Sequence, residues 1–460
     1  MAHRLFTFWW NSATVRGSHG VGMEASNRHD DNEGGPPAWR LHGAGAVAAG
    51  AWLILVWRSH TAGGATLGWM LGVVAVAWAS LAFAWCASDS GGRGGRVVAV
   101  WALGFRLVAF FAQPVLEDDH HRFLWDGHRF AVTGNPYAEP PQARFGDESI
   151  APEFRAVLDR INHPDVATVY GPATQWAFRA AHAVAPAQLW PWKLILLGAE
   201  LALGVLLWPV LGARGRLLLA WCPLAIFETG FNAHPDALAI ALAVVAWRNR
   251  ERGWGVAAGV ALGAAIAAKV FAVLLAPFIL WRLGARAWIA AVGAGLACYA
   301  PFWLRGSGAD LAGLRAMAGE WEFNSSVYAL AAAATSPPIA RGVCAVAFGA
   351  IWAGLFLRWR RTFAQPPPGT WIYGAFLLLS ATANPWYALW LWPFVALRPS
   401  ATGVAVLAAV SLSYATGLNL GDPSLGNFGH PAWLRPVEFG AIMIAAGWDW
   451  RSAKKAAREM

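Results

Sequence analysis

The sequence predicts an all-α, polytopic membrane protein, and three observations support this prediction. Of the 460 residues, 57% are hydrophobic and only 13% are charged, whereas a soluble domain carries about 25% charged residues. Apolar segments recur along most of the chain, and 30 tryptophans suit the aromatic belts at the two membrane faces. We therefore expect about 12–14 transmembrane helices, some of them tilted or broken.

The chain divides into a short tail and one membrane domain. Residues 1–37 are polar and close with Gly34-Gly35-Pro36-Pro37, so we expect a disordered cytoplasmic tail, in which Met23 is an alternative start. Residues 38–460 then form the transmembrane domain. Its apolar segments lie near 41–57, 66–87, 97–113, 188–211, 216–231, 235–247, 254–268, 270–281, 287–304, 339–357, 370–382, 385–397, 401–419 and 432–450.

Basic residues fall in every second loop, which predicts the orientation in the membrane. Cytoplasmic loops carry an excess of Lys and Arg, so the basic loops and both termini are expected inside. The region 114–187 then lies outside, as do Lys269 and Asn384. The basic loops hold Arg93, Arg96, Arg214, Arg216, Arg248, Arg250, Arg252, Arg282, Arg286, Arg358, Arg360, Arg361, Arg398, Arg451, Lys454, Lys455 and Arg458.

The net charge of +9 does not indicate a nucleic-acid partner, because Lys and Arg are scattered between apolar segments rather than gathered. The four cysteines stand singly in apolar segments and match no disulfide or zinc pattern. We expect membrane lipids as partners, no nucleic acid and no cofactor.

The most polar stretch runs from Val115 to Pro141 and interrupts the apolar segments. It places nine ionisable side chains within thirteen positions, namely Glu117, Asp118, Asp119, His120, His121, Arg122, Asp126, His128 and Arg129. A single Asp or Arg at the centre of a bilayer costs roughly 2.5–3.5 kcal/mol. The stretch is therefore expected at a membrane surface or in a wet cavity, as the active-site loop of a membrane enzyme.

Asp118 and Asp119 follow the third apolar segment and are the candidate catalytic carboxylates. Adjacent residues leave a helix about 100° apart, so we expect only one of them to face a cavity. A carboxylate near an apolar pocket has a raised pKa and can take the proton of an attacking hydroxyl. The alternative is a solvated acidic loop.

Arg122, Asp126 and Arg129 share one face of a helical stretch. Asp126 is therefore expected to pair with one of the two arginines, and a free arginine could face a phosphate. The following Thr133-Gly134-Asn135-Pro136-Tyr137 has the composition of a turn. Residues 147–165 read as a short amphipathic helix lying on the membrane, with Phe154, Val157, Leu158 and Ile161 on its apolar face.

Three further polar residues stand in the loops expected outside. Lys269 separates two short apolar segments and either extends to the interface or binds a phosphate. His234 and Asp236 open a helix, where Asp236 could be its cap. A metal site built from His120, His121, His128, His234 and Asp236 matches no recognised ligand spacing, so no metal is predicted.

Five segments resemble the GT-C glycosyltransferases, in particular bacterial family 87-like mannosyltransferases that use polyprenol-phosphate-mannose. The segments span three-fifths of the chain in the family's order. They are EDDHHRFLWDG…GNPY at 117–137, INHPDVATVYGPATQ at 161–175, NAHPDALAIAL at 232–242, AAKVFAVLLAPF at 267–278 and NPWYALWLWPF at 384–394.

The resemblance implies a GT-C fold with a large first catalytic extracytoplasmic loop, in a bacterial inner membrane. It also implies transfer of a hexose, mannose above all, from a polyprenyl-phosphate donor to a lipid or glycan acceptor by inverting displacement. Asp118 would be the general base with Asp119 beside it. Candidate donor-phosphate residues are Lys269, His234, Arg122 and Arg129. Candidate residues of the substrate cavity are Asp126, Asn135, Tyr137, Tyr170, Gln175, Asp236, Asn384, Trp386 and Tyr387.

The chain departs from the family pattern at four positions, which leave the sugar and any metal requirement open. His120 and His121 follow the acidic pair, Gly171 replaces a proline, and Asn384 replaces a histidine. Two other classes of protein fit the composition: a lipid-linked sugar flippase or secondary transporter, and a structural subunit whose acidic loop docks a partner. The even spread of charges at segment ends, without repeated halves, argues against a transporter.

Overall fold

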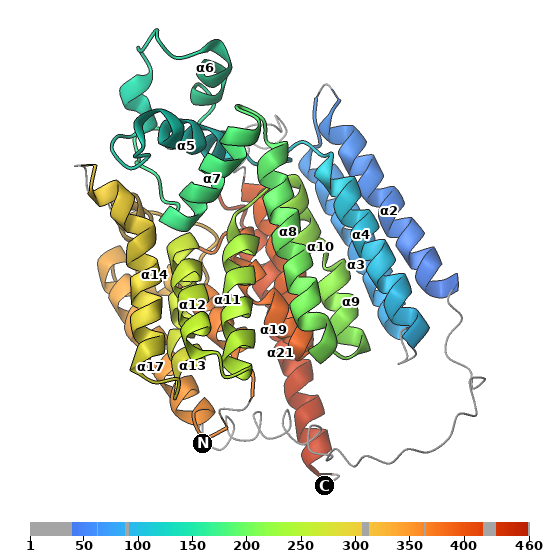
Figure 1. The fold of residues 1–460 in the computed structure, drawn as a ribbon. Helices are drawn as coiled ribbons and strands as arrows, with labels where there is room; N and C mark the ends of the chain where they lie inside the picture. Colours follow the sequence, from blue (N-terminus) through green and yellow to red (C-terminus); the bar gives the residue numbers. More distant parts are fainter. Residues whose placement is uncertain are drawn as a thin grey trace.

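The computed structural model describes residues 39–61, 63–87, 92–305, 312–362, 365–416 and 429–458. Within these ranges all regular structure is helical, apart from one isolated bridge between Phe323 and Thr382 (Figure 1). The all-α class is therefore confirmed. The expected tail at 1–37 lies outside the described residues.

Among the described residues, four helices are long and apolar enough to cross a membrane, by length and composition. They are α2 (Trp39–Ser59), α3 (Leu67–Ala87), the stretch Trp190–Val210 and α17 (Pro337–Trp359). Shorter apolar helices occupy Gly255–Ala268, Val270–Leu280, Gly369–Leu379 and Ala401–Thr416. These helices support a membrane protein, whereas the expected number of 12–14 spans stays a prediction.

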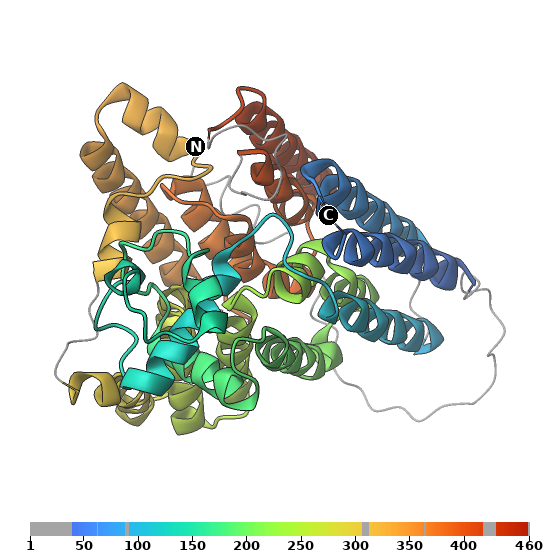
Figure 2. The ribbon, with the colours of Figure 1, turned by 90° about the horizontal axis from the view of Figure 1, so that it is seen from above.

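The helices form a bundle with a cap at one end. Figure 1 shows the long helices side by side, with α5, α6 and α7 at one end of the bundle. Seen from above in Figure 2, this cap covers one side, and α2 and α3 stand on the other. The cap consists of α5 (Asp119–Thr133), η1 (Pro141–Arg144), α6 (Pro152–Leu158) and α7 (Pro172–Val184).

The other elements follow in chain order. After α3 come α4 (Gly92–Phe110) and, beyond the cap, α8 (Trp190–Leu207), η2 (Trp208–Val210), α9 (Ala213–Trp221), α10 (Pro223–Ala225), η3 (Ile226–Phe231), α11 (Asp236–Glu251), α12 (Gly255–Ala268), η4 (Val270–Leu275), α13 (Ala276–Leu280) and α14 (Ala285–Trp303). The C-terminal part holds α15 (Ala312–Gly319), α16 (Val327–Ala334), α17, α18 (Gly369–Leu379), η5 (Pro385–Trp390), α19 (Trp392–Leu397), α20 (Ala401–Ala409), η6 (Val410–Thr416) and α21 (Leu434–Arg458).

Several apolar segments are broken where the sequence interrupts the helical hydrogen bonds. The segment expected at 216–231 divides at Cys222, which precedes Pro223 and has ψ 113°. A residue before proline is disfavoured in the helical region. Lys269 is extended, with φ −148° and ψ 124°, and separates α12 from η4. Both breaks are followed by π- or 3₁₀-helix, so these segments are not single continuous spans.

The basic loops expected inside gather at one end of the bundle. The Arg250 guanidinium lies 5.1 Å from the Trp359 ring, at the ends of α11 and α17. Trp359 Nε1 donates to the Gln365 carbonyl at 3.0 Å, and Arg398 donates to the Gln365 side chain at 2.7 Å. In Figure 1 the C-terminal end of α21 lies opposite the cap. The side of the membrane on which each end lies stays a prediction.

The amphipathic segment near 147–165 differs from its expectation. Only Pro152–Leu158 is helical, and Phe154, Val157, Leu158 and Ile161 are buried against Trp125 of α5. The expectation that this face lies on the membrane is therefore wrong, because α5 already covers it. The segment instead anchors the loop that follows, at 161–166, to the cap.

Close packing of α12 on α14 depends on glycine. A Cβ atom at Gly263 would lie 2.1 Å from the Ala291 carbonyl oxygen, and one at Gly259 would lie 2.1 Å from that of Ala287. Small residues allow helix backbones in membranes to approach this closely.

We expect Gly263→Ala to destabilise the protein by about 1–3 kcal/mol, because the added methyl group must force the two backbones apart. Gly293→Ala on α14 is the matched control, since a Cβ there meets nothing within 4 Å. In the helix interior it should be neutral or stabilising by about 0.5–1 kcal/mol. Thermal unfolding in detergent measures both, and equal melting temperatures would contradict the close approach.

Candidate active site

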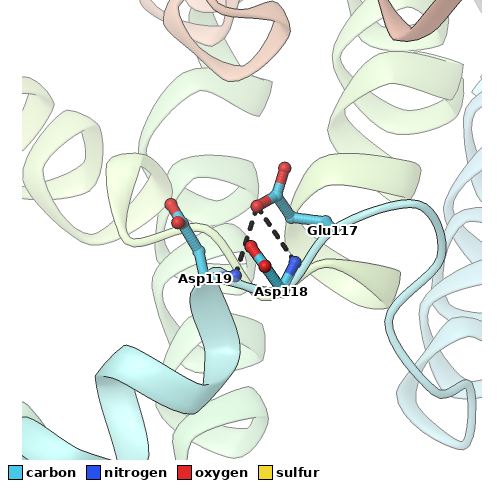
Figure 3. Close-up of side chains that lie close together, drawn as sticks. All are labelled: Glu117, Asp118 and Asp119. Carbon is cyan, nitrogen blue, oxygen red and sulfur yellow. Dashed lines mark hydrogen bonds between the residues drawn. The ribbon is translucent and has the colours of Figure 1, made fainter. Parts of the chain in front are cut away.

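The acidic stretch forms a tight turn at the start of α5. The chain between α4 and α5 has a strained residue, Leu116 at φ 55°, and the Val115 N–H donates to Asn232 Oδ1 at 2.9 Å. Glu117 Oε1 then accepts the backbone N–H groups of Asp118 and Asp119, both at 3.2 Å (Figure 3). Glu117 therefore satisfies the first free N–H groups of the helix, where negative charge is favoured.

One amide group joins the two candidate catalytic carboxylates. Asn162 Nδ2 donates to Asp118 Oδ1 at 2.6 Å and to Asp119 Oδ1 at 2.9 Å. The Tyr170 hydroxyl donates to Asp119 Oδ2 at 3.0 Å. Asp119 thus uses both oxygens. Asp118 Oδ2 has no hydrogen-bond partner among the described residues.

The expectation that only one of the two aspartates faces a cavity stays a prediction, but the two side chains converge on one residue. Both reach the same Asn162 amide. The expected separation of about 100° does not apply, because Asp118 precedes α5, with φ −117° and ψ −2°, and is not part of the helix.

Burial without a neighbouring cation raises the pKa of two carboxyl groups of this turn, Asp118 and Glu117. Burial, and then the charge of Asp119, raises the pKa of Asp118 to about 6, although the Asn162 hydrogen bond opposes the change. Burial and the two aspartates likewise raise the pKa of Glu117 well above its ordinary value. Burial lowers the pKa of His120 to about 3 and of His121 to about 4, so both rings are neutral at pH 7.

Arg122 and Asp126 form the expected intrahelical pair, but as part of the framework. Arg122 Nε lies 3.0 Å from Asp126 Oδ1, and Arg122 Nη2 donates to the Val166 carbonyl at 2.8 Å. Gln175 Nε2 donates to Asp126 Oδ2 at 2.8 Å and to Thr168 Oγ1 at 2.9 Å. All these polar groups are buried. The network ties α5 to α7 and to the loop before it.

Arg129 does not join that pair. It donates to Glu139 at 2.5 Å, and Glu139 also binds Arg144 at 2.7 Å. Asn135 Oδ1 accepts the Tyr137 N–H at 3.0 Å, which closes the predicted turn. The Tyr137 hydroxyl then donates to the Tyr170 carbonyl at 2.8 Å. Through Tyr137 this turn supports Tyr170, and Tyr170 in turn supports Asp119.

Lys269 lies in a second group of predicted residues. Its Nζ is 3.2 Å from Asp236 Oδ2 and 5.0 Å from the centre of the Tyr387 ring, and 14% of its side chain is exposed. Asp236 Oδ1 accepts Trp390 Nε1 at 2.8 Å. The alternative that Asp236 caps α11 is therefore wrong, because its side chain makes no cap bond.

His234 and Asn384 complete this second group. The His234 ring is fully buried and stacks on Trp386 at 3.9 Å between centroids. Its Nε2 lies 3.5 Å from Glu228 Oε2. Asn384 is half-buried, and its carbonyl accepts the Tyr387 N–H at 3.0 Å at the start of η5.

A short segment joins the two groups. Tyr170 binds Asp119, and the next residue, Gly171, packs so closely on α12 that a Cβ there would lie 2.1 Å from the Ala267 carbonyl oxygen. Thr174 Oγ1 donates to the Ala268 carbonyl at 2.9 Å, directly before Lys269. The start of α7 thus holds the acidic turn and the lysine in one arrangement.

The acidic turn is also the one place in the described ranges where three side chains have metal-ligand spacing. One oxygen each of Glu117, Asp118 and Asp119 lies within 4.8 Å of the others. Carboxylate oxygens suit Mg²⁺ or Ca²⁺. The alternative set of His120, His121, His128, His234 and Asp236 forms no such group among the described residues.

Sequence reasoning missed two residues of the site. Asn162 had no signal, because a lone Asn in a loop has no periodicity. Glu228 had one, since it is an acidic residue within an expected apolar segment. It is fully buried and accepts the Tyr414 hydroxyl at 3.0 Å.

We expect Asp118→Asn to be more stable than the wild type at pH 7.5. A carboxyl group whose folded pKa is about 6 rather than 3.8 destabilises the folded state as pH rises through that window, and an amide does not. About two pKa units correspond to at most ~3 kcal/mol. The gain should vanish below about pH 4. Thermal unfolding at several pH values measures it, with the exposed Asp159→Asn as control. A gain independent of pH would contradict the raised pKa.

Comparison of the chain with protein-family models, with curated proteins and with solved structures found no match. The chemistry of the site therefore rests on its own residues and their geometry.

Proposed function

We propose that the protein is a GT-C type membrane glycosyltransferase. In this proposal it transfers a hexose, with mannose favoured, from a polyprenyl-phosphate donor to a lipid or glycan acceptor of the cell envelope. The observation that carries it is Asp118, a carboxylate with one bound oxygen, one oxygen without a hydrogen-bond partner among the described residues, and a pKa of about 6. A general base works best with a pKa near the operating pH.

The proposed reaction is an inverting displacement. The acceptor hydroxyl oxygen attacks the anomeric carbon and gives its proton to Asp118 Oδ2. The bond from the anomeric carbon to the phosphate oxygen breaks on the opposite face, and the polyprenyl phosphate leaves as an anion. Asp119 is not the base, because Asn162 and Tyr170 occupy its oxygens.

Lys269 is the cation that we assign to the leaving phosphate. It is partly exposed, and its one described carboxylate partner is Asp236. A cation aimed at developing negative charge stabilises the transition state. Arg122 is paired with Asp126 and bound to the Val166 carbonyl, and Arg129 is paired with Glu139, so we assign them no phosphate contact.

The proposed location is a bacterial inner membrane with the site on the extracytoplasmic face. The four apolar helices support a membrane protein. The basic loops gather at the end opposite the cap that carries Asp118, as the positive-inside rule favours. A lipid donor explains the many apolar helices, since its chain needs a hydrocarbon environment.

Purified protein in lipid vesicles with a labelled polyprenyl-phosphate mannose should yield a new glycoside of inverted anomeric configuration. Asp118→Asn should lower turnover by about 10²–10⁴ while donor binding is kept, because only proton transfer is lost. Asp159→Asn is the control. Labelled donor that crosses the bilayer without forming a glycoside would indicate a flippase and sink the proposal, as would full activity in Asp118→Asn.

The activity should depend on the protonation of Asp118. The base must be ionised, so kcat/KM should be low at pH 5, rise through about pH 6 and level off above it. The donor phosphodiester has no proton to lose in this range. A profile that is flat from pH 5 to 8 would argue against Asp118 as the base.

A further inference from the structure

Asn162 is the one described residue that contacts both candidate catalytic carboxylates. Its amide nitrogen donates one hydrogen to Asp118 Oδ1 at 2.6 Å and the other to Asp119 Oδ1 at 2.9 Å. Neither aspartate forms an ion pair among the described residues. The two carboxylates, adjacent in sequence and mutually repulsive, are thus held together by one neutral group.

The loop around Asn162 is fixed from both sides. Before it, Ile161 is buried with Trp125 and Leu158. After it, His163 has φ 45° and its ring stacks on Trp321 at 4.6 Å between centroids. A positive φ in a residue other than glycine is held only where surrounding contacts determine it. The amide therefore reaches the carboxylates from a rigid support.

The support also reaches the lysine side of the site. Phe323 comes two residues after Trp321; its N–H donates to the Ala381 carbonyl at 3.0 Å and its carbonyl accepts the Ala383 N–H at 2.8 Å. Shortly after Ala383 the chain forms η5, which brings Tyr387 against Lys269. These contacts connect the Asn162 loop to the lysine side of the site.

Because it is neutral, the Asn162 amide can hold Asp118 without lowering its pKa as far as a cation would. An Arg or Lys next to an aspartate lowers its pKa by 1–3 units, which would leave a weak base. The groups that face Asp118 are Asp119 and Glu117 on its own segment and Asn162 on the opposing loop. The Asn162 amide orients the Asp118 carboxylate and cancels only part of the rise in the Asp118 pKa that burial causes.

We infer that Asn162 is a positioning residue of the proposed transferase. Its amide group holds Asp118 and Asp119 in one arrangement and leaves the second oxygen of Asp118 for the acceptor hydroxyl. The inference rests on the proposed function and deepens it, because it names the residue that sets the direction of the base.

The test compares Asn162→Ala and Asn162→Asp with the wild type, in the full-length protein, with polyprenyl-phosphate mannose as donor. In Asn162→Ala, kcat should fall about 10–100-fold, with little change in the donor KM. The acid limb of the kcat/KM profile, meaning the pH at which kcat/KM falls as Asp118 is protonated, should move up by about one pH unit. The reason is that the Asn162 hydrogen bond, which opposes protonation of Asp118, is lost. Asn162→Asp keeps the shape of the side chain but adds a negative charge, so it should move the acid limb to still higher pH.

Gln142→Ala, which removes an exposed amide from the same cap, is the matched control and should match the wild type. If the acid limb of Asn162→Ala lies at the wild-type pH, the inference is overturned, whether or not kcat falls. A merely structural role would lower activity without moving this limb. An acid limb that moves to lower pH in Asn162→Asp would also overturn the inference.

A second measurement separates this inference from the proposed function. A wild-type protein that forms no glycoside would overturn the proposed function. The pH dependence of thermal unfolding, taken as the difference between proteins with and without Asp118→Asn, reports the Asp118 titration directly. In the Asn162→Ala background its midpoint should move upward. An unchanged midpoint would show that the amide does not hold Asp118, regardless of any activity.

Discussion

The site depends on three consecutive carboxyl groups, Glu117 buried and the two aspartates half-buried, that form no ion pair with a described residue. Each is held by neutral donors instead. Glu117 accepts two backbone N–H groups at the start of α5, Asp118 and Asp119 share the Asn162 amide, and Asp119 accepts the Tyr170 hydroxyl. Lost hydration and mutual repulsion then keep the proton affinity of Glu117 and Asp118 high. The loops of the cap are arranged to bring these donors together from three separate segments.

The cations of the cap are placed where they cannot cancel this effect. Arg122 binds Asp126 within the buried network, and Arg129 shares Glu139 with Arg144. These pairs build the support on which Tyr170 rests. Gly171 permits the contact of α7 with α12. A larger residue there would need room that the Ala267 carbonyl occupies, so close packing explains the glycine.

Local features of this structure were predictable from the sequence and contacts between distant segments were not. The helical class, the i,i+4 pair of Arg122 with Asp126 and the turn at Asn135 each follow from spacing within a few residues. Asn162 binds partners 43 and 44 positions away, and no pattern marks such a contact. The spacing of the apolar residues around Phe154 was recognised, but the membrane was assigned as their partner, because periodicity cannot tell whether a membrane or α5 covers such a face.

The same reasoning accounts for the pairing of Lys269 with Asp236. A mostly buried ammonium group without a counterion is costly, so an anion must accompany it before any donor arrives. Trp390 holds Asp236 from the other side, which fixes the carboxylate but leaves the lysine its rotatable stem. In the proposed reaction a donor phosphate can then share the ammonium with Asp236.

The acidic turn, by contrast, must never meet a cation of the protein, since an ion pair would lower the proton affinity that its burial creates. Separation of the two charges by the Tyr170–Gly171 segment meets both requirements.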